Sequence, residues 1–248
     1  MLNQLNLSEL LLIDIETVPG QARFEEISPA LQELWIEKHS KIKPESGIPP
    51  SEAYAERAGI YAEFGKIICI SAGYFTASSG DITQEAATHF QFRVTSFFGD
   101  QESEILQDFF QVVKKVQHKP GFRLAGHNIQ EFDLPYICRR ALIQGLALPE
   151  ALQLYGKKPW EVPVLDTLHL WRFGDYKHYT SLQLLTTVLG IPSPKEDLHG
   201  SEVAKVYWQD HDFERIVQYC QKDVVAVAQL LLRLQNLPLL EDQDIQYV

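Results

Sequence analysis

The sequence predicts an α/β fold in which a single mixed β-sheet is covered by helices on both faces. The first observation is a continuous apolar run at residues 9–17, ELLLIDIET, which is typical of a strand buried on both faces. The second is the order of patterns along the chain, because strand-like segments come first and helices alternate with shorter strands afterwards. A single domain of 248 residues is long enough to bury such a core.

The first three strands are expected to form an antiparallel meander. The run at residues 9–17 stops at Pro19, and a second apolar run follows at residues 66–75. Residues 78–81, Ser-Ser-Gly-Asp, predict a turn, and residues 89–97 alternate between apolar and polar as a third strand does. Strands joined by short turns pair antiparallel, which makes the predicted sheet a mixed one.

A long segment, residues 19–64, separates the first two strands. Within it, Ser28 has the character of an N-cap and Pro29 suits the first helical position. A helix is therefore expected at residues 28–41, with a shorter one at residues 51–58. The whole segment exceeds the usual length of a connection. We interpret it as an insertion that either covers a site as a lid or only decorates the domain.

The second half of the chain alternates helices with short strands. Residues 100–116 carry apolar side chains at helical spacing, and residues 122–125 read as a fourth strand. A helix at residues 131–142 and a fifth strand at residues 162–165 follow. The acidic tail at residues 241–248 is expected to fray. Further helices are expected at residues 180–189, 201–208 and 212–234.

The composition is that of an ordinary globular protein, with 45% hydrophobic and 22% charged residues. Cys69, Cys138 and Cys220 have no paired spacing, which argues against a disulfide framework or a zinc knuckle and favours a cytoplasmic location. The apolar run at residues 10–13 is too short for a signal peptide or a membrane span. The net charge of −11 disfavours tight, processive nucleic-acid binding, although residues 111–180 carry a local balance of +4 and the rest of the chain −15.

Two pairs of residues have spacings that place their side chains together. Asp14 and Glu16 are two apart on the first strand, so both carboxylates point to the same side. Tyr219 and Asp223 are four apart on the last helix and share one face. A hard divalent cation would cancel the repulsion between buried carboxylates. The alternative for each pair is a solvated position at a strand end or on a helix surface.

A third motif lies between the fourth strand and the next helix, where Asn128 precedes Phe132 and Asp133. A helix cap and the helix dipole alone would account for Asn128 and Asp133. Taken in order, however, LLIDIET, AGHNIQEFDLPYI and YCQKD resemble the three motifs of the DEDDy branch of the DEDD 3′–5′ exonucleases. The sequence is most similar to the proofreading exonuclease domain of family B DNA polymerases. FGKIICISAGYF and SFFGDQESEILQDFF extend the resemblance, which covers residues 8–235 without a polymerase domain.

The resemblance implies an RNase H-like fold with a five-stranded sheet, and a free-standing 3′–5′ exonuclease that uses two divalent cations, Mg²⁺ or Mn²⁺. It implies that Asp14, Glu16 and Asp223 hold the first cation. Asp14 would bridge to the second cation, which Asp133 would support through water. Tyr219 would orient the attacking water. Thr17 would lie near the terminal 3′ hydroxyl, and Asn128 and Phe132 near the terminal nucleotides.

Cleavage of a phosphodiester bond places charge on the attacking and leaving oxygens, and two cations about 3.5–4 Å apart can stabilise both. The expected substrate is the 3′ end of nucleic acid, single-stranded DNA first, with release of nucleoside 5′-monophosphates. A separate polymerase or repair complex is a candidate partner, and no membrane is expected. An exoribonuclease acting on RNA ends and a catalytically silent binding module on the same fold stay open as alternatives. Basic and aromatic residues alternate at 155–160, which includes Lys157 and Lys158, and at 172–179, so both segments are candidate strand contacts.

Overall fold

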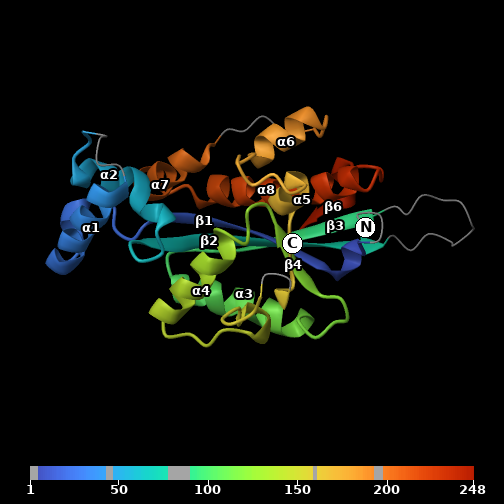
Figure 1. Ribbon diagram of the computed structural model, residues 1–248, viewed down its shortest axis with the longest axis horizontal. Coiled ribbons are helices and arrows are strands. Elements are labelled where there is room, and N and C mark those ends of the chain that lie inside the picture. The colour runs from blue at the N-terminus through green and yellow to red at the C-terminus, as the bar shows by residue number, and fades with distance from the viewer. Residues whose placement is uncertain (1–4, 43–46, 78–89, 159–160, 193–197) are drawn as a thin grey trace, which may run out of the picture.

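A six-stranded sheet with the order β5-β4-β1-β2-β3-β6 forms the centre of the structure, a computed structural model (Figure 1). β1, β2 and β3 are antiparallel neighbours, whereas β4 is parallel to β1, β5 to β4 and β6 to β3. The predicted mixed sheet is confirmed, and the predicted turn at residues 78–81 lies outside the described residues. The structure describes residues 5–42, 47–77, 90–158, 161–192 and 198–248. The strands are β1 (Leu10–Pro19), β2 (Gly65–Ala77), β3 (Phe90–Phe98), β4 (Arg123–Gly126), β5 (Val164–Asp166) and β6 (Ile245–Tyr247).

Helices cover both faces of the sheet, as predicted. Figure 1 shows α3 and α4 on one face, α5 to α8 on the other, and α1 and α2 at one end. The short helix α5 was not expected from the sequence. Within the described ranges, no helix combines the length and the apolar character needed to cross a membrane. The helices are α1 (Pro29–Ile42), α2 (Pro50–Arg57), α3 (Glu102–Val116), α4 (Asp133–Ile143), α5 (Thr167–Arg172), α6 (Leu182–Val188), α7 (Val203–Lys205) and α8 (Phe213–Leu234).

The side chains of β1 alternate between the two faces. Leu11 and Ile13 pack into the core beneath α3 and α4. Leu10 and Leu12 pack on the opposite face, in a core that includes Val224 of α8. Because successive strand residues point to opposite faces, the even-numbered residues that follow on β1 continue the row that faces α8. The acidic pair of the first motif therefore points towards α8.

The C-terminal tail is ordered, so the expectation that it frays is wrong, and the sheet has six strands instead of five. β6 pairs with β3, and Arg93 Nε of β3 donates to Gln246 Oε1 at 2.9 Å. Gln229 of α8 fixes the approach to the strand, because its side-chain amide donates to the Leu240 carbonyl at 2.8 Å and accepts from the Leu240 amide at 2.9 Å. This buried double hydrogen bond gives the tail a position that its polar, acidic sequence alone does not encode.

The segment predicted as one helix at residues 201–208 is irregular. It consists of a 3₁₀ turn (Gly200–Glu202), the three residues of α7 and a π-helical turn (Val206–Asp210). Trp208 Nε1 donates to the Pro19 carbonyl at 3.2 Å, which ties the segment to the end of β1. This contact holds the segment beside the acidic pair of the first motif.

Candidate active site

Asp14 and Glu16 lie on β1 beneath α8, with Cys220 of α8 against them. A carboxylate oxygen from each acid and Cys220 Sγ all lie within 4.8 Å of one another. Cys220 Sγ lies 3.4 Å from Asp14 Oδ2 and 3.5 Å from the Asp14 carbonyl oxygen, which joins α8 to β1 at this point. Nothing in the sequence analysis singled out Cys220 as part of the site. Its position one residue after Tyr219, on the sheet-facing side of the helix, was the available signal.

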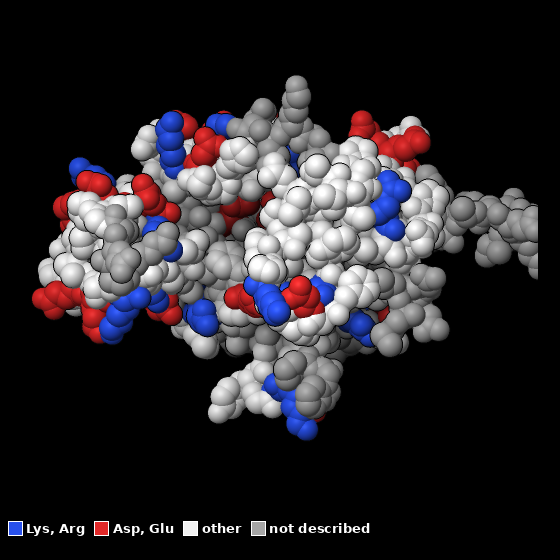
Figure 2. All heavy atoms as spheres, turned by 45° about the horizontal axis from the view of Figure 1, so that its top comes forward, with Lys and Arg blue, Asp and Glu red and all other residues white. Residues whose placement is uncertain are grey.

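Two further acids, Asp133 and Asp223, lie outside this 4.8 Å group but act on its acids through their charge. Asp133 is the first residue of α4, is 4% exposed, and accepts a hydrogen bond from the Ile15 amide of β1 at 3.2 Å. The charge of Asp223 on α8 raises the pKa values of Asp14, Glu16 and Asp133, so it acts on all three. We refer to Asp14, Glu16, Asp133 and Asp223 as the acidic cluster. Figure 2 shows acidic side chains at the bottom of a hollow in the molecular surface.

Burial and mutual repulsion raise the proton affinity of the acidic cluster. Burial first, and then the charges of Asp223, Asp133 and Glu16, place the pKa of Asp14 well above its usual value. Burial and Asp223 do the same to the pKa of Glu16. Burial raises the pKa of Asp133 to about 7, although hydrogen bonds from its own amide and that of Ile15 act in the opposite direction. A bound cation would relieve this cost, because an opposite charge favours the ionised acids.

Tyr219 lines one of two cavities near the acidic cluster, and its hydroxyl lies close to a residue that lines the other. Tyr219 and Asp223, one turn apart on α8, line a cavity of about 650 Å³ that α6 and the C-terminal segment complete. Glu16 lines a smaller cavity of about 220 Å³, together with Thr17 and Phe132. Gly200 lines this cavity too, and a side-chain carbon added there would lie 3.8 Å from the Tyr219 hydroxyl. The structure thus brings Thr17 and Phe132 together with Glu16, and Tyr219 together with Asp223.

Asn128 sits in a turn that Asp166 of β5 holds in place. Its backbone has a φ of 61°, and its amide donates to Asp166 Oδ1 at 3.0 Å. The other Asp166 oxygen accepts from the Gln130 amide at 3.1 Å, and Asp166 also caps α5 through the Leu168 amide at 2.9 Å. Asn128 Oδ1 is buried and accepts no hydrogen bond within the part of the chain that the structure describes. Sequence analysis missed Asp166. The pattern that could have indicated it is an acidic residue directly after a short apolar strand.

Residues 62–242 match a family model described as a predicted 3′–5′ exonuclease related to the exonuclease domain of PolB. The matched span is more than half of the chain. The chain belongs to this exonuclease family. The match includes Asp133, Tyr219 and Asp223 but begins after Asp14 and Glu16, whose place in the site comes from the geometry of β1.

Among solved structures, the chain is similar to the family B DNA polymerase of the hyperthermophilic archaeon Pyrobaculum calidifontis. The sequence identity is 15%, the TM-score is 0.48, and the similarity covers 90% of this chain. It covers 24% of the polymerase chain, so this member of the exonuclease family spans about a quarter of that protein's length. No curated protein matches the sequence.

The donor set of this exonuclease-family chain suits hard divalent cations. Carboxylate oxygens are the ligands that Mg²⁺ and Mn²⁺ prefer. Among the described residues, no lysine or arginine contributes to the raised pKa values of Asp14 and Glu16, so no basic side chain neutralises them. The acidic cluster therefore fits the cations that the sequence resemblance implies. Cys220 adds a softer donor, whose thiol keeps a raised pKa because of burial and the neighbouring Cys69.

The two basic and aromatic segments differ in their distance from the site. Tyr179, in the segment at residues 172–179, is 63% exposed, and its pKa is raised by burial of its hydroxyl and by the charges of Asp133 and Asp166. That segment reaches the acidic cluster. Lys157 and Lys158 are exposed and follow a turn that packs against the α3–α4 core, on the other face of the sheet.

Proposed function

We propose that this protein is a two-metal 3′–5′ exonuclease that releases nucleoside 5′-monophosphates from the 3′ ends of single-stranded DNA. The observation that carries the proposal is the mutual electrostatic action of four carboxylates from β1, α4 and α8, and no lysine or arginine in the described part of the chain lowers the pKa values of the pair on β1. Such a group has a strong electrostatic reason to bind cations. The relation to the exonuclease domain of PolB favours DNA over RNA.

Each residue of the site has a role in this proposal. Asp14, Glu16 and Asp223 would hold one cation, and Asp14 and Asp133 would face the second. Two bound divalent cations supply a water of lowered pKa and offset the charge on the departing 3′ oxygen. Tyr219 holds the attacking water through its hydroxyl, next to the cavity that Glu16 lines. No side chain attacks the phosphorus, so no covalent intermediate forms.

The substrate contacts follow from the groups around the acidic cluster. Thr17 and Phe132 line the small cavity beside Glu16 and face the terminal nucleotide. Asn128 keeps the place near the terminal nucleotides that the sequence resemblance implies, although its Oδ1 is buried and the residue lines neither cavity. Tyr179 offers an exposed ring on which a base can stack.

The test is a digest of one oligonucleotide labelled at either end. With Mg²⁺ or Mn²⁺ present, the 3′-labelled strand should release labelled mononucleotide at once, while the 5′-labelled strand should shorten stepwise. EDTA should stop both reactions. A matched RNA strand distinguishes an exoribonuclease, which would degrade RNA faster than DNA. A protein that binds neither cation and releases no nucleotide from either polymer contradicts the proposal and fits a silent binding module.

A further inference from the structure

The small cavity beside Glu16 has a wall that comes from the long segment between β1 and β2. Its volume is about 220 Å³. This is smaller than the roughly 300–1,000 Å³ of ordinary ligand pockets, so the cavity suits a group no larger than a single nucleoside. We call residues 56–60, the end of α2 and the 3₁₀ turn after it, the corner. The lining residues from the corner are Glu56, Gly59 and Ile60, and those from other elements include Phe132, Gly200 and Ser201.

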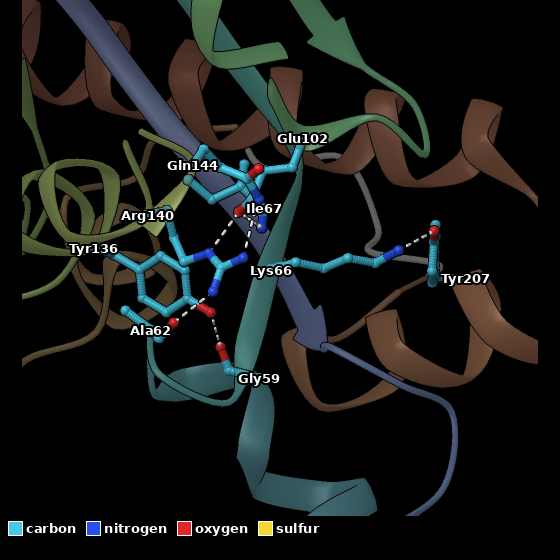
Figure 3. A network of polar contacts seen from close by, with 9 residues as sticks. All are labelled: Gly59, Ala62, Lys66, Ile67, Glu102, Tyr136, Arg140, Gln144 and Tyr207. Atoms are coloured by element: carbon cyan, nitrogen blue, oxygen red, sulfur yellow. Dashed lines mark hydrogen bonds and ion pairs between the residues drawn. The ribbon is translucent and has the colours of Figure 1, made fainter. Parts of the chain in front are cut away.

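The corner is fixed against β1 and α4. Tyr136 of α4 donates its hydroxyl hydrogen to the Gly59 carbonyl at 2.7 Å (Figure 3). The Tyr136 ring also contacts the Phe132 ring, with 5.5 Å between centroids. A side-chain carbon at Gly59 would lie 3.1 Å from the Val18 backbone, so the close approach to β1 depends on glycine. The corner is thus held by the same tyrosine that packs against Phe132 of the cavity lining.

A buried ion pair anchors the chain that follows the corner. Arg140 of α4 donates from Nη1 to the Ala62 carbonyl at 2.8 Å and from Nε to Glu102 Oε1 at 2.8 Å (Figure 3). On the other side, the segment has its own apolar core around Trp35, which is fully buried and donates from Nε1 to the Pro50 carbonyl at 2.7 Å. These contacts make the corner a fixed wall and not a loose lid.

The groups on the wall define what the cavity accepts. Ile60 lines the cavity and is 49% exposed, so it offers apolar surface to a base or sugar in the cavity that Phe132 also lines. Two carboxylates, those of Glu16 and Glu56, line the cavity, and among the described residues no lysine or arginine does. A hydroxyl can donate a hydrogen bond to such a carboxylate, whereas a terminal phosphate would meet like charge.

We infer that the corner is the specificity wall of this nuclease, and that it admits one unpaired nucleoside that ends in a free 3′-hydroxyl. Ile60 packs against the base or sugar, and Glu56 selects the hydroxyl over a 3′-phosphate. The inference rests on the proposed function, which places the 3′ end of the DNA strand in this cavity. It assigns substrate recognition to residues of the 19–64 segment.

The test compares corner variants with controls from the same segment. Ile60→Ala should raise KM for single-stranded DNA roughly fivefold at unchanged kcat, because a contact made equally before and during cleavage changes only binding. Ile36→Ala is the matched control, since Ile36 is 47% exposed on α1 and does not line the cavity. Glu56→Gln should reduce the preference for 3′-hydroxyl over 3′-phosphate ends roughly fivefold. Glu52→Gln, an exposed acid on the same helix, should leave that preference unchanged.

Calorimetric binding of two nucleotides with Mg²⁺ separates this inference from the proposed function. Thymidine 5′-monophosphate should bind more weakly to Ile60→Ala than to Ile36→Ala. Thymidine 3′,5′-bisphosphate should bind more weakly than the monophosphate, and Glu56→Gln should narrow the difference. Equal binding by test and control variants overturns the specificity wall even if the protein digests DNA. Absence of turnover in the wild-type protein defeats the proposed function, while the binding comparison still decides the role of the corner.

Discussion

The structure buries carboxylates on both faces of the sheet and gives them opposite surroundings. On the α3–α4 face, Glu102 is 5% exposed and accepts hydrogen bonds from the Ile67 amide at 2.7 Å and Gln144 Nε2 at 2.6 Å. Arg140 neutralises it through an ion pair (Figure 3). On the α8 face, the charged neighbours of Asp14 and Glu16 are other acids of the acidic cluster.

The difference in compensating groups distinguishes a buried acid with a structural role from a buried acid with a ligand-binding role. Burying a charge is expensive unless donors and an opposite charge compensate for it. Glu102 obtains that compensation within the chain, and it ties α3 to α4 and β2. In the acidic cluster, Asp133 accepts from its own amide and from that of Ile15, and Asp14 contacts the Cys220 thiol, yet burial and mutual repulsion still raise the pKa values of Asp14, Glu16 and Asp133. A bound cation would supply the opposite charge that favours the ionised acids.

The largest expected effect is a loss of catalytic activity when an acid of the acidic cluster is removed. Asp14→Ala should lower the rate of nucleotide release at least a thousandfold, about 4 kcal/mol of barrier, because a shared cation ligand is lost. Stability without metal should not fall, because the substitution removes one of several repelling charges. Digestion of a labelled oligonucleotide and urea unfolding in EDTA measure the two quantities. Tyr219→Phe, which keeps every carboxylate, should lose less activity. Near-normal turnover of purified Asp14→Ala would contradict the assignment.

The next largest effect is a loss of stability when Glu102 loses its ion-pair partner Arg140. Arg140→Met should lower the free energy of unfolding by about 3 kcal/mol, because Glu102 then stays buried without its counter-charge. The double variant with Glu102→Gln removes the stranded charge and should recover a large part of the loss. Urea unfolding at neutral pH measures both variants. If the single and double variants are equally unstable, the ion pair is not what compensates Glu102.

A smaller effect should appear when metal-free protein is titrated. The pKa of Asp133 is about 7 in the folded protein and 3.8 in the reference state, so the folded form binds the extra proton between these values. The contribution of Asp133 to stability should therefore be highest at low pH and fall as the pH rises towards 7, by about 2 kcal/mol between pH 5 and pH 7. Asp133→Asn should flatten this part of the profile in EDTA, and saturating Mg²⁺ should offset the loss. If the free energy of unfolding of the wild-type protein rises with pH relative to that of Asp133→Asn, the predicted direction of the pH dependence is wrong.

The parts of the site that follow a local period could be predicted from the sequence. Asp14 and Glu16 share a face because β1 is a regular strand up to Glu16, where a bulge shifts its register with β2. Tyr219 and Asp223 share a face because α8 is a regular helix. In each case the apolar residues around the motif determine which side is buried, so the direction of the polar side chains follows from spacing alone.

The parts that depend on contacts between distant residues could not be predicted. Cys220 meets Asp14 only because α8 packs across β1, and nothing in either local sequence records that crossing. Asp166 holds the turn at Asn128 through backbone amides, which carry no sequence signal. β6 exists because Gln229 secures the chain at Leu240 before it reaches β3. Tertiary hydrogen bonds of this kind override local propensity.

The smallest expected effect belongs to charges that are neither buried nor paired with the acidic cluster. Lys157 and Lys158 are exposed beyond the α3–α4 face, so they can meet a strand only after it has left the site. Replacing both with Gln should weaken binding of long strands and reduce the slope of log affinity against log salt by up to about 1.4, since each phosphate contact contributes about 0.7. A trinucleotide should bind as it does to the wild-type protein. Lys114 and Lys115, an exposed pair on α3, form the matched control. An equal change in both double variants would indicate a general effect of net charge, and no change in either would remove the lysines at 157 and 158 from the strand path.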